Sequence, residues 1–126
     1  MNLFLDDERN PMDVTWVNLP LCHWTIVRSY DEFTAAIREN GLPEVISFDH
    51  DLGEEAYTHA FANNLEFFNY TAVKEKTGYD CAMWLVNYCL DRRIALPKYY
   101  VHTMNPIGAE NIIKLFESYQ RFDYEA

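Results

Sequence analysis

Three short apolar runs in this chain stop abruptly at polar residues, and this pattern constrains the fold more than any other feature. The runs end at Asp6, Asp49 and His102, and further charged or hydrogen-bonding residues follow each of them. In an open parallel sheet, functional sites form outside the carboxyl ends of the strands. If the three runs are neighbouring parallel strands, their polar ends meet in one crevice.

Segments with helical periodicity alternate with these strand-like runs. The sequence predicts strands at residues 2–6, 25–30, 45–48 and 99–101, and helices at 31–40, 55–68, 80–93 and 107–120. Residues 10–24 contain two prolines and two tryptophans, so we expect a packed, irregular connection there. The alternation indicates a single-domain α/β fold of three layers, on a short, mostly parallel sheet of about four strands, with a helical insertion at 54–76.

Local residues predict where the helices begin and which faces they bury. Ser29 or Asp31 can cap the helix at 31–40, and Asp80 can cap the helix at 80–93. We expect a largely buried face on each of the last two helices and a core position for all three tryptophans. The residues predicted to be buried in these helix faces or in the core are Trp16, Trp24, Met83, Trp84, Leu85, Val86, Cys89, Leu90, Ile112, Ile113, Leu115, Phe116 and Tyr119.

Charge and cysteine content exclude several classes of protein. The 126 residues carry a formal net charge of −10, which disfavours binding to bulk nucleic acid or to an anionic membrane. A small nucleotide or a cleaved RNA end stays compatible with this charge if a metal offsets it locally. Three cysteines without a C-x-x-C spacing indicate free thiols. With no signal-peptide pattern and no membrane-length apolar run, we expect a soluble, cytoplasmic protein.

Carboxylates gather at two of the strand ends. Asp6 and Asp7 follow the first run, and Asp49 and Asp51 follow the third, where alternate residues share a face. Four carboxylates in one crevice would repel one another unless a cation such as Mg²⁺ sits among them. His50 would add a nitrogen ligand and favour Mn²⁺. The alternative is that acidic residues at strand ends serve only as turn and cap residues, which is the commoner role for such a pair taken alone.

The fourth run adds groups suited to phosphate chemistry. His102 is followed by Thr103 and Asn105, and Gly108 opens a helix whose first N–H groups can hold an anion. Imidazoles can transfer protons beside a metal, and Arg9 can contact a phosphate in a bidentate manner. The alternatives are a structural histidine and a solvated surface arginine.

Two further features have simple structural explanations. Gly78 and Asp80 read as a turn glycine and a helix cap. The aromatic stripe at 57–70 reads as core or as a surface for a partner, which leaves a protein–protein adaptor as one alternative function.

Four motifs in this order resemble a known family. They are L-D-D-E-R-N-P, F-D-H-D-L-G, T-G-Y-D and V-H-T-M-N-P-I-G. Together they resemble the cyclic-phosphate-processing receiver domains, and the resemblance covers the chain except residues 10–24 and 54–76. It implies a flavodoxin-like receiver fold and a cyclic-phosphate substrate.

The resemblance also implies roles for individual positions. It places Asp6 and Asp7 as an acidic metal-binding pair, Asp49 at the phosphoacceptor position and Thr103 near the hydroxyl position. The added histidines, His50 and His102, imply an enzyme-like site. Nothing resembling a fifth strand follows the last predicted helix, and no lysine stands there to neutralise an acyl phosphate, which counts against phosphotransfer signalling.

These observations predict a metal-dependent phosphoesterase-like enzyme acting on a cyclic phosphate of a nucleotide or an RNA-derived product. Its cofactor would be a divalent cation, Mg²⁺ or Mn²⁺. The predicted residues are Asp49, His50 and His102 for catalysis, Arg9, Thr103, Asn105 and Gly108 for the substrate, and Asp6, Asp7, Asp49 and Asp51 for the metal. A non-catalytic binder of a nucleotide and a degenerate receiver are the alternatives.

Overall fold

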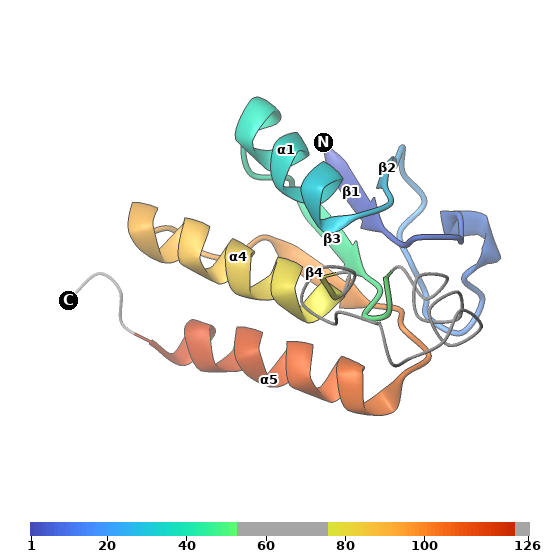
Figure 1. Ribbon diagram of the computed structural model, residues 1–126. Coiled ribbons are helices and arrows are strands. Elements are labelled where there is room, and N and C mark those ends of the chain that lie inside the picture. The colour runs from blue at the N-terminus through green and yellow to red at the C-terminus, as the bar shows by residue number, and fades with distance from the viewer. Residues whose placement is uncertain (53–75, 123–126) are drawn as a thin grey trace, which may run out of the picture.

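A computed structural model describes residues 1–52 and 76–122 and shows one parallel sheet of four strands (Figure 1). The strands are β1 (Asn2–Leu5), β2 (Thr25–Val27), β3 (Val45–Phe48) and β4 (Lys98–Val101), in the spatial order β2-β1-β3-β4. Every pairing is parallel. This is the order of the first four strands of a flavodoxin-like sheet. The predicted α/β receiver-like class is confirmed.

The described helical elements comprise one 3₁₀ turn and three α-helices, and each of the three α-helices begins at a side-chain cap. These elements are the 3₁₀ turn η1 (Pro11–Asp13) and the helices α1 (Tyr30–Asn40), α4 (Gly78–Arg92) and α5 (Pro106–Arg121). Ser29, the first of the two predicted candidates, caps α1 by accepting a hydrogen bond from the Glu32 amide. This cap ends the second strand at Val27, so the predicted extension of that strand to residue 30 is wrong.

Thr77 caps α4, and the prediction that Asp80 does so is wrong. The hydroxyl of Thr77 accepts a hydrogen bond from the Asp80 amide, and the Asp80 carboxylate accepts one from the Thr77 amide. This reciprocal capping box satisfies two N–H groups that a helix start otherwise leaves unpaired. Asp80 is therefore part of the cap, but it lies at the third residue of the helix.

All three described α-helices pack on one face of the sheet. They lie side by side in the order α1, α4, α5 (Figure 1). Alternate strand residues point toward them, among them Leu3 and Leu5 of β1 and Ile46 and Phe48 of β3, and all four are fully buried. This face holds the main hydrophobic core.

The opposite face of the sheet is covered differently. Phe4 and Ser47, which alternate with the core residues, are buried there, and Trp24 packs edge-on against Phe4. In the described part of the chain, the irregular segment 10–24 takes the place of a helical layer on this face, as its prolines predict. The predicted third layer is thus a loop with one 3₁₀ turn.

Several predictions about burial need correction. Trp16 is 41% exposed, and Trp24 and Trp84 are half-buried, so none of them is a fully enclosed core residue. The helix faces are also narrower than predicted, because three of their apolar residues are exposed: Met83, Leu90 and Ile113. Cys89 is buried, as predicted, and Cys81 is buried as well.

The predicted helix at 55–68 and the insertion at 54–76 lie outside the described residues, except for Lys76. Among the residues that the structure does describe, no helix has both the length and the apolar character needed to cross a membrane.

Candidate active site

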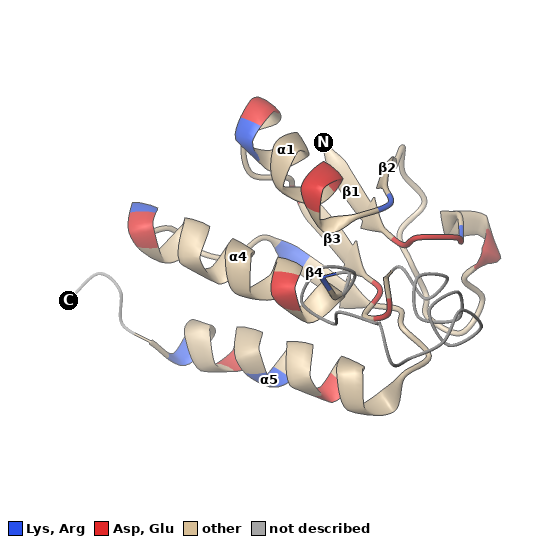
Figure 2. Cartoon of the chain, viewed as in Figure 1, with Lys and Arg blue, Asp and Glu red and all other residues tan. Residues whose placement is uncertain are grey.

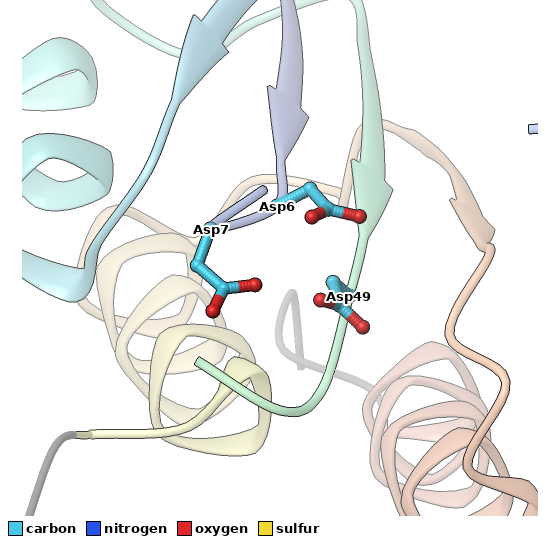
Figure 3. A group of neighbouring side chains, drawn as sticks. All are labelled: Asp6, Asp7 and Asp49. Atoms are coloured by element: carbon cyan, nitrogen blue, oxygen red, sulfur yellow. The ribbon is translucent and has the colours of Figure 1, made fainter. Parts of the chain in front are cut away.

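Three carboxylates meet at the carboxyl edge of the sheet. Acidic residues follow the ends of β1 and β3 (Figure 2). Asp6 and Asp7 come from the first and Asp49 from the second, and because these strands are neighbours their side chains converge (Figure 3). One ligand atom of each lies within 4.8 Å of the others. The predicted meeting of the two acidic clusters is therefore observed for these three residues, the three-carboxylate cluster.

Asp6 is held rigidly in its ionised form. Its side chain is 1% exposed, and Oδ1 accepts hydrogen bonds from the amides of Glu8 (2.9 Å) and Arg9 (2.7 Å). Nε2 of His102 lies 3.0 Å from Oδ2. Burial raises the pKa of Asp6, but the hydrogen bonds from His102 and from the two amides outweigh it and lower the pKa to about 2.

Asp49 differs from Asp6 because its surroundings disfavour the ionised carboxylate. It is 4% exposed, and burial together with the negative charge of Asp6 raises its pKa to about 6. His102, the His50 amide and the Thr103 hydroxyl oppose this rise. One buried carboxylate is thus firmly ionised while its neighbour resists ionisation, a separation of pKa values that is common at functional sites.

His102 is a buried residue that contacts Asp6 of the cluster. The ring is fully buried and stacks on Phe4, with ring centroids 4.5 Å apart. Because Asp6 is ionised, Nε2 of His102 carries a proton and donates a hydrogen bond to Asp6. Nδ1 lies 2.6 Å from Oγ of Ser47. Both ring nitrogens are therefore occupied by protein groups, and the ring does not reach the surface.

The cluster suits a hard divalent cation. Carboxylate oxygens are the ligands that Mg²⁺ prefers, and a cation among them would relieve the repulsion that raises the pKa of Asp49. In the described ranges the cluster contains no histidine, so nothing in it selects Mn²⁺ over Mg²⁺ through a nitrogen ligand. Asp51, also predicted as a ligand, lies outside the three-carboxylate cluster.

An open pocket of about 260 Å³ adjoins the cluster. Its described lining is polar except for Met104, and consists of Asp7, Glu8, Arg9, Asp49, Asp51, Thr103, Met104 and Asn105. We call it the acidic pocket. The acidic pocket brings together residues predicted to bind the metal and residues predicted to bind the substrate. His50, His102 and Gly108 are not among its described lining residues.

Arg9 and Thr103, both predicted to bind the substrate, line the acidic pocket. Nη1 of Arg9 lies 3.6 Å from Oδ2 of Asp6, and its side chain is about one-third exposed. Thr103 is nearly buried, and its hydroxyl hydrogen-bonds with Asp49. Arg9 thus offers a positive charge at the pocket wall, and Thr103 orients the carboxylate beside it.

A hydrogen-bonded network links His50 to two residues of the pocket lining, Asp51 and Asn105. Nδ1 of His50 lies 2.9 Å from Oδ1 of Asp51, and Nδ2 of Asn105 donates to the same carboxylate at 3.4 Å. The other end of the Asn105 amide caps α5 by accepting from the Gly108 amide. The Gly108 amide is therefore already engaged within the protein.

Two glycines have packing roles that explain their motifs. A Cβ at Gly108 would overlap the His50 ring, so the T-M-N-P-I-G motif brings α5 close to that imidazole. A Cβ at Gly78 would overlap the carbonyl oxygen of Asp49, and the Gly78 amide donates to the His50 carbonyl. The T-G-Y-D motif thus lets α4 start directly against the acidic strand end.

Three residues of the site were not predicted. Ser47 binds His102, and its signal was a lone hydroxyl inside an otherwise apolar strand. Nη1 of Arg28 donates to the carbonyls of Asp6 and Arg9, which holds the loop after β1, and no local pattern indicated this. Trp16, predicted as core, donates from Nε1 to the His102 carbonyl at 2.7 Å.

Comparison with known proteins identifies a family that this chain matches. The model of the cyclic-phosphate processing receiver domain family matches residues 1–118. No match is found among curated proteins or among solved structures. The family match spans both acidic strand ends, the capped start of α4 and the β4–α5 junction. The chain belongs to the cyclic-phosphate processing receiver domain family.

Proposed function

We propose that the protein hydrolyses a cyclic phosphate with the help of a divalent cation bound beside the acidic pocket. One observation carries the proposal: Asp49, a buried carboxylate with its pKa raised to about 6, lies between the firmly ionised Asp6 and a polar pocket that also presents Arg9. A carboxylate whose pKa is raised this way is typical of a catalytic or metal-binding centre.

The three-carboxylate cluster, Asp6, Asp7 and Asp49, would hold the cation. The cation would supply Lewis-acid stabilisation of the negative charge that develops on a phosphoryl group. Arg9 would bind a non-bridging oxygen of the phosphate, since a guanidinium is suited to planar, bidentate contact with phosphate.

Ring opening requires that water form a new P–O bond while one ester P–O bond breaks. The attacking water loses a proton, and the departing sugar oxygen gains one. The pair formed by His50 and Asp51 supports proton transfer, because Asp51, which lines the pocket, holds the imidazole in a defined orientation. His102 has neither an exposed ring nor an unoccupied nitrogen, so we assign it the positioning of Asp6 in place of the predicted acid–base role.

A direct test is incubation with cyclic phosphates, followed by phosphorus NMR with and without Mg²⁺. The panel includes 2′,3′-cyclic nucleotides, and the proposal predicts a new monoester resonance that EDTA suppresses. Asp49→Asn should abolish it, whereas Asp91→Asn, the same change on the exposed surface of α4, should not. Equal turnover in the two variants would contradict the proposal.

A second candidate function is sequestration of the cyclic phosphate without hydrolysis. It is favoured by one observation, namely that the described lining of the acidic pocket contains no histidine or lysine. In this case the phosphorus resonance of the ligand would shift or broaden on addition of protein, and the unaltered ligand would be recovered after the protein is removed.

A further inference from the structure

A second, larger hollow lies next to the acidic pocket. It measures about 780 Å³ and is formed by residues of the 10–24 segment. Its apolar lining includes Met12, Val14, Trp16, Leu19, Leu21 and Trp24. We call it the tryptophan hollow. It forms where an irregular segment covers the sheet in place of a helix, and its volume falls in the range of about 300–1,000 Å³ that is typical of small-molecule sites.

Trp16 joins the two spaces. It lines the tryptophan hollow, while Nε1 donates to the carbonyl of His102, the residue before Thr103 in the acidic pocket. The guanidinium carbon of Arg9, another residue of the acidic pocket, lies 5.2 Å from the centroid of the Trp16 ring. One molecule can therefore contact both spaces across adjoining side chains.

Trp16 is also exposed and fixed at the same time. Its side chain remains 41% exposed although the indole nitrogen is anchored by a 2.7 Å hydrogen bond. An aromatic ring that is exposed to solvent and already fixed can stack on a ligand without a further loss of side-chain conformational entropy on binding. Core tryptophans enclose their rings, so simple packing does not account for this arrangement.

We propose that the tryptophan hollow is the subsite for the nucleobase of the substrate, stacked against Trp16. The proposal rests on the proposed function for the phosphate end, because a ribose carries its base and its cyclic phosphate on neighbouring parts of one ring. It narrows the substrate class from any cyclic phosphate to one attached to a nucleoside.

The lining of the hollow favours a base over an acyl chain or a peptide. Thr15 and Asn18 add hydroxyl and amide groups to the aromatic walls, which matches the polar edge and the apolar face of a base. Stacking of a base on an aromatic side chain tolerates different bases, so the subsite is expected to accept purines and pyrimidines.

Adenosine and uridine test the subsite alone, because they carry a base and no phosphate. The probe is the set of indole N–H resonances in nitrogen–proton NMR spectra, assigned by single Trp→Phe variants. Saturable shifts of the Trp16 resonance with an unmoved Trp84 resonance are expected. Trp16→Leu should weaken binding by about tenfold, the factor expected for the loss of one base stack, and Trp84→Leu should leave it unchanged.

Substitution of Trp16 also removes its hydrogen bond to His102, so a second measurement does not depend on a variant. In the unaltered protein, nuclear Overhauser effects should connect base protons with the Trp16 ring. If neither nucleoside moves the Trp16 resonance or gives such effects, the proposal is overturned.

A matched pair of phosphates separates this proposal from the proposed function. Adenosine 2′,3′-cyclic phosphate and the 2,3-cyclic phosphate of methyl riboside differ only in the base. If both are hydrolysed with equal kcat/KM, the base subsite fails and the proposed function stands. If nucleosides bind at Trp16 and neither phosphate is hydrolysed or bound, the subsite stands and the proposed function fails.

Discussion

Nε2 of His102 lies 3.0 Å from Oδ2 of Asp6, and this contact joins the ends of two strands that are not neighbours. The residues are 96 positions apart, and β3 lies between β1 and β4. The imidazole reaches across β3, where Ser47 binds its other nitrogen. The position of Asp6 therefore depends on contacts that span three neighbouring strands, β1, β3 and β4.

The first prediction concerns removal of this imidazole. His102→Ala leaves a buried carboxylate and a buried hydroxyl without their partner, and it opens a cavity beside Phe4. We expect a loss of about 2–4 kcal/mol in the free energy of unfolding, measured by urea denaturation.

The control for that measurement is His23→Ala, an exposed histidine in the 10–24 segment, which should change stability little. A folded His102→Ala variant of unchanged stability would show that the buried hydrogen bonds contribute nothing. Asp6 should also titrate at higher pH in this variant, because the loss of His102 removes a hydrogen bond that lowers its pKa.

The second prediction concerns the pH dependence of stability without metal. The pKa of Asp49 rises from 3.8 to about 6 on folding, so the folded state binds a proton more tightly than the unfolded state. Stability should therefore fall as the pH rises from about 4 through 6, and it should stay low above that.

Asp49→Asn removes this effect. Its advantage in the free energy of unfolding over the unaltered protein should grow by about 1–3 kcal/mol between pH 4 and pH 7.5, as measured in EDTA. Asp6 stays ionised throughout this range because its pKa is about 2. An advantage of Asp49→Asn that did not change with pH would show that Asp49 ionises normally.

The third prediction concerns binding of Mg²⁺. Protonated Asp49 cannot serve as an anionic ligand, so the affinity for Mg²⁺ should fall about tenfold between pH 7 and pH 5, as measured by calorimetry. Binding near pH 6 should release a proton, which is detected as a dependence of the heat on the buffer. An affinity that is constant over this range would remove Asp49 from the ligand set.

The fourth prediction concerns the contact of Gly108 with His50. Gly108→Ala places a Cβ into the imidazole and should lower both stability and turnover. In a His50→Ala background the ring is absent and only the Cβ of residue 50, 2.8 Å from the added Cβ, remains, so the same substitution should cost less stability than it does in the unaltered protein.

Gly78→Ala provides the contrast, because the overlapping group there is the Asp49 carbonyl oxygen and no side-chain change can relieve it. We expect it to remain destabilising in the His50→Ala background. If His50→Ala rescued both glycine variants equally, the assignment of separate contacts would be wrong.

Most of the fold could be predicted from local patterns. The strand at residues 45–48 is observed at its predicted bounds, and α5 differs from its prediction by one residue at each end. Short apolar runs between helical periods leave few alternatives to a parallel sheet, and the rule for strand ends then places Asp6 and Asp49 together. The order and residue types of the sequence alone therefore determined the fold class and the location of the site.

The tertiary structure decided what each polar residue does at that location. His50 and His102 are both imidazoles after a strand, yet one is partly exposed and bonded to Asp51, and the other is buried with two partners. Gly108 approaches His50, and Trp16 reaches His102, through long-range packing that has no local signal. Spacing along a chain specifies the edge at which a residue arrives, but burial and hydrogen-bond partners depend on distant segments, and these fix its charge and its accessibility.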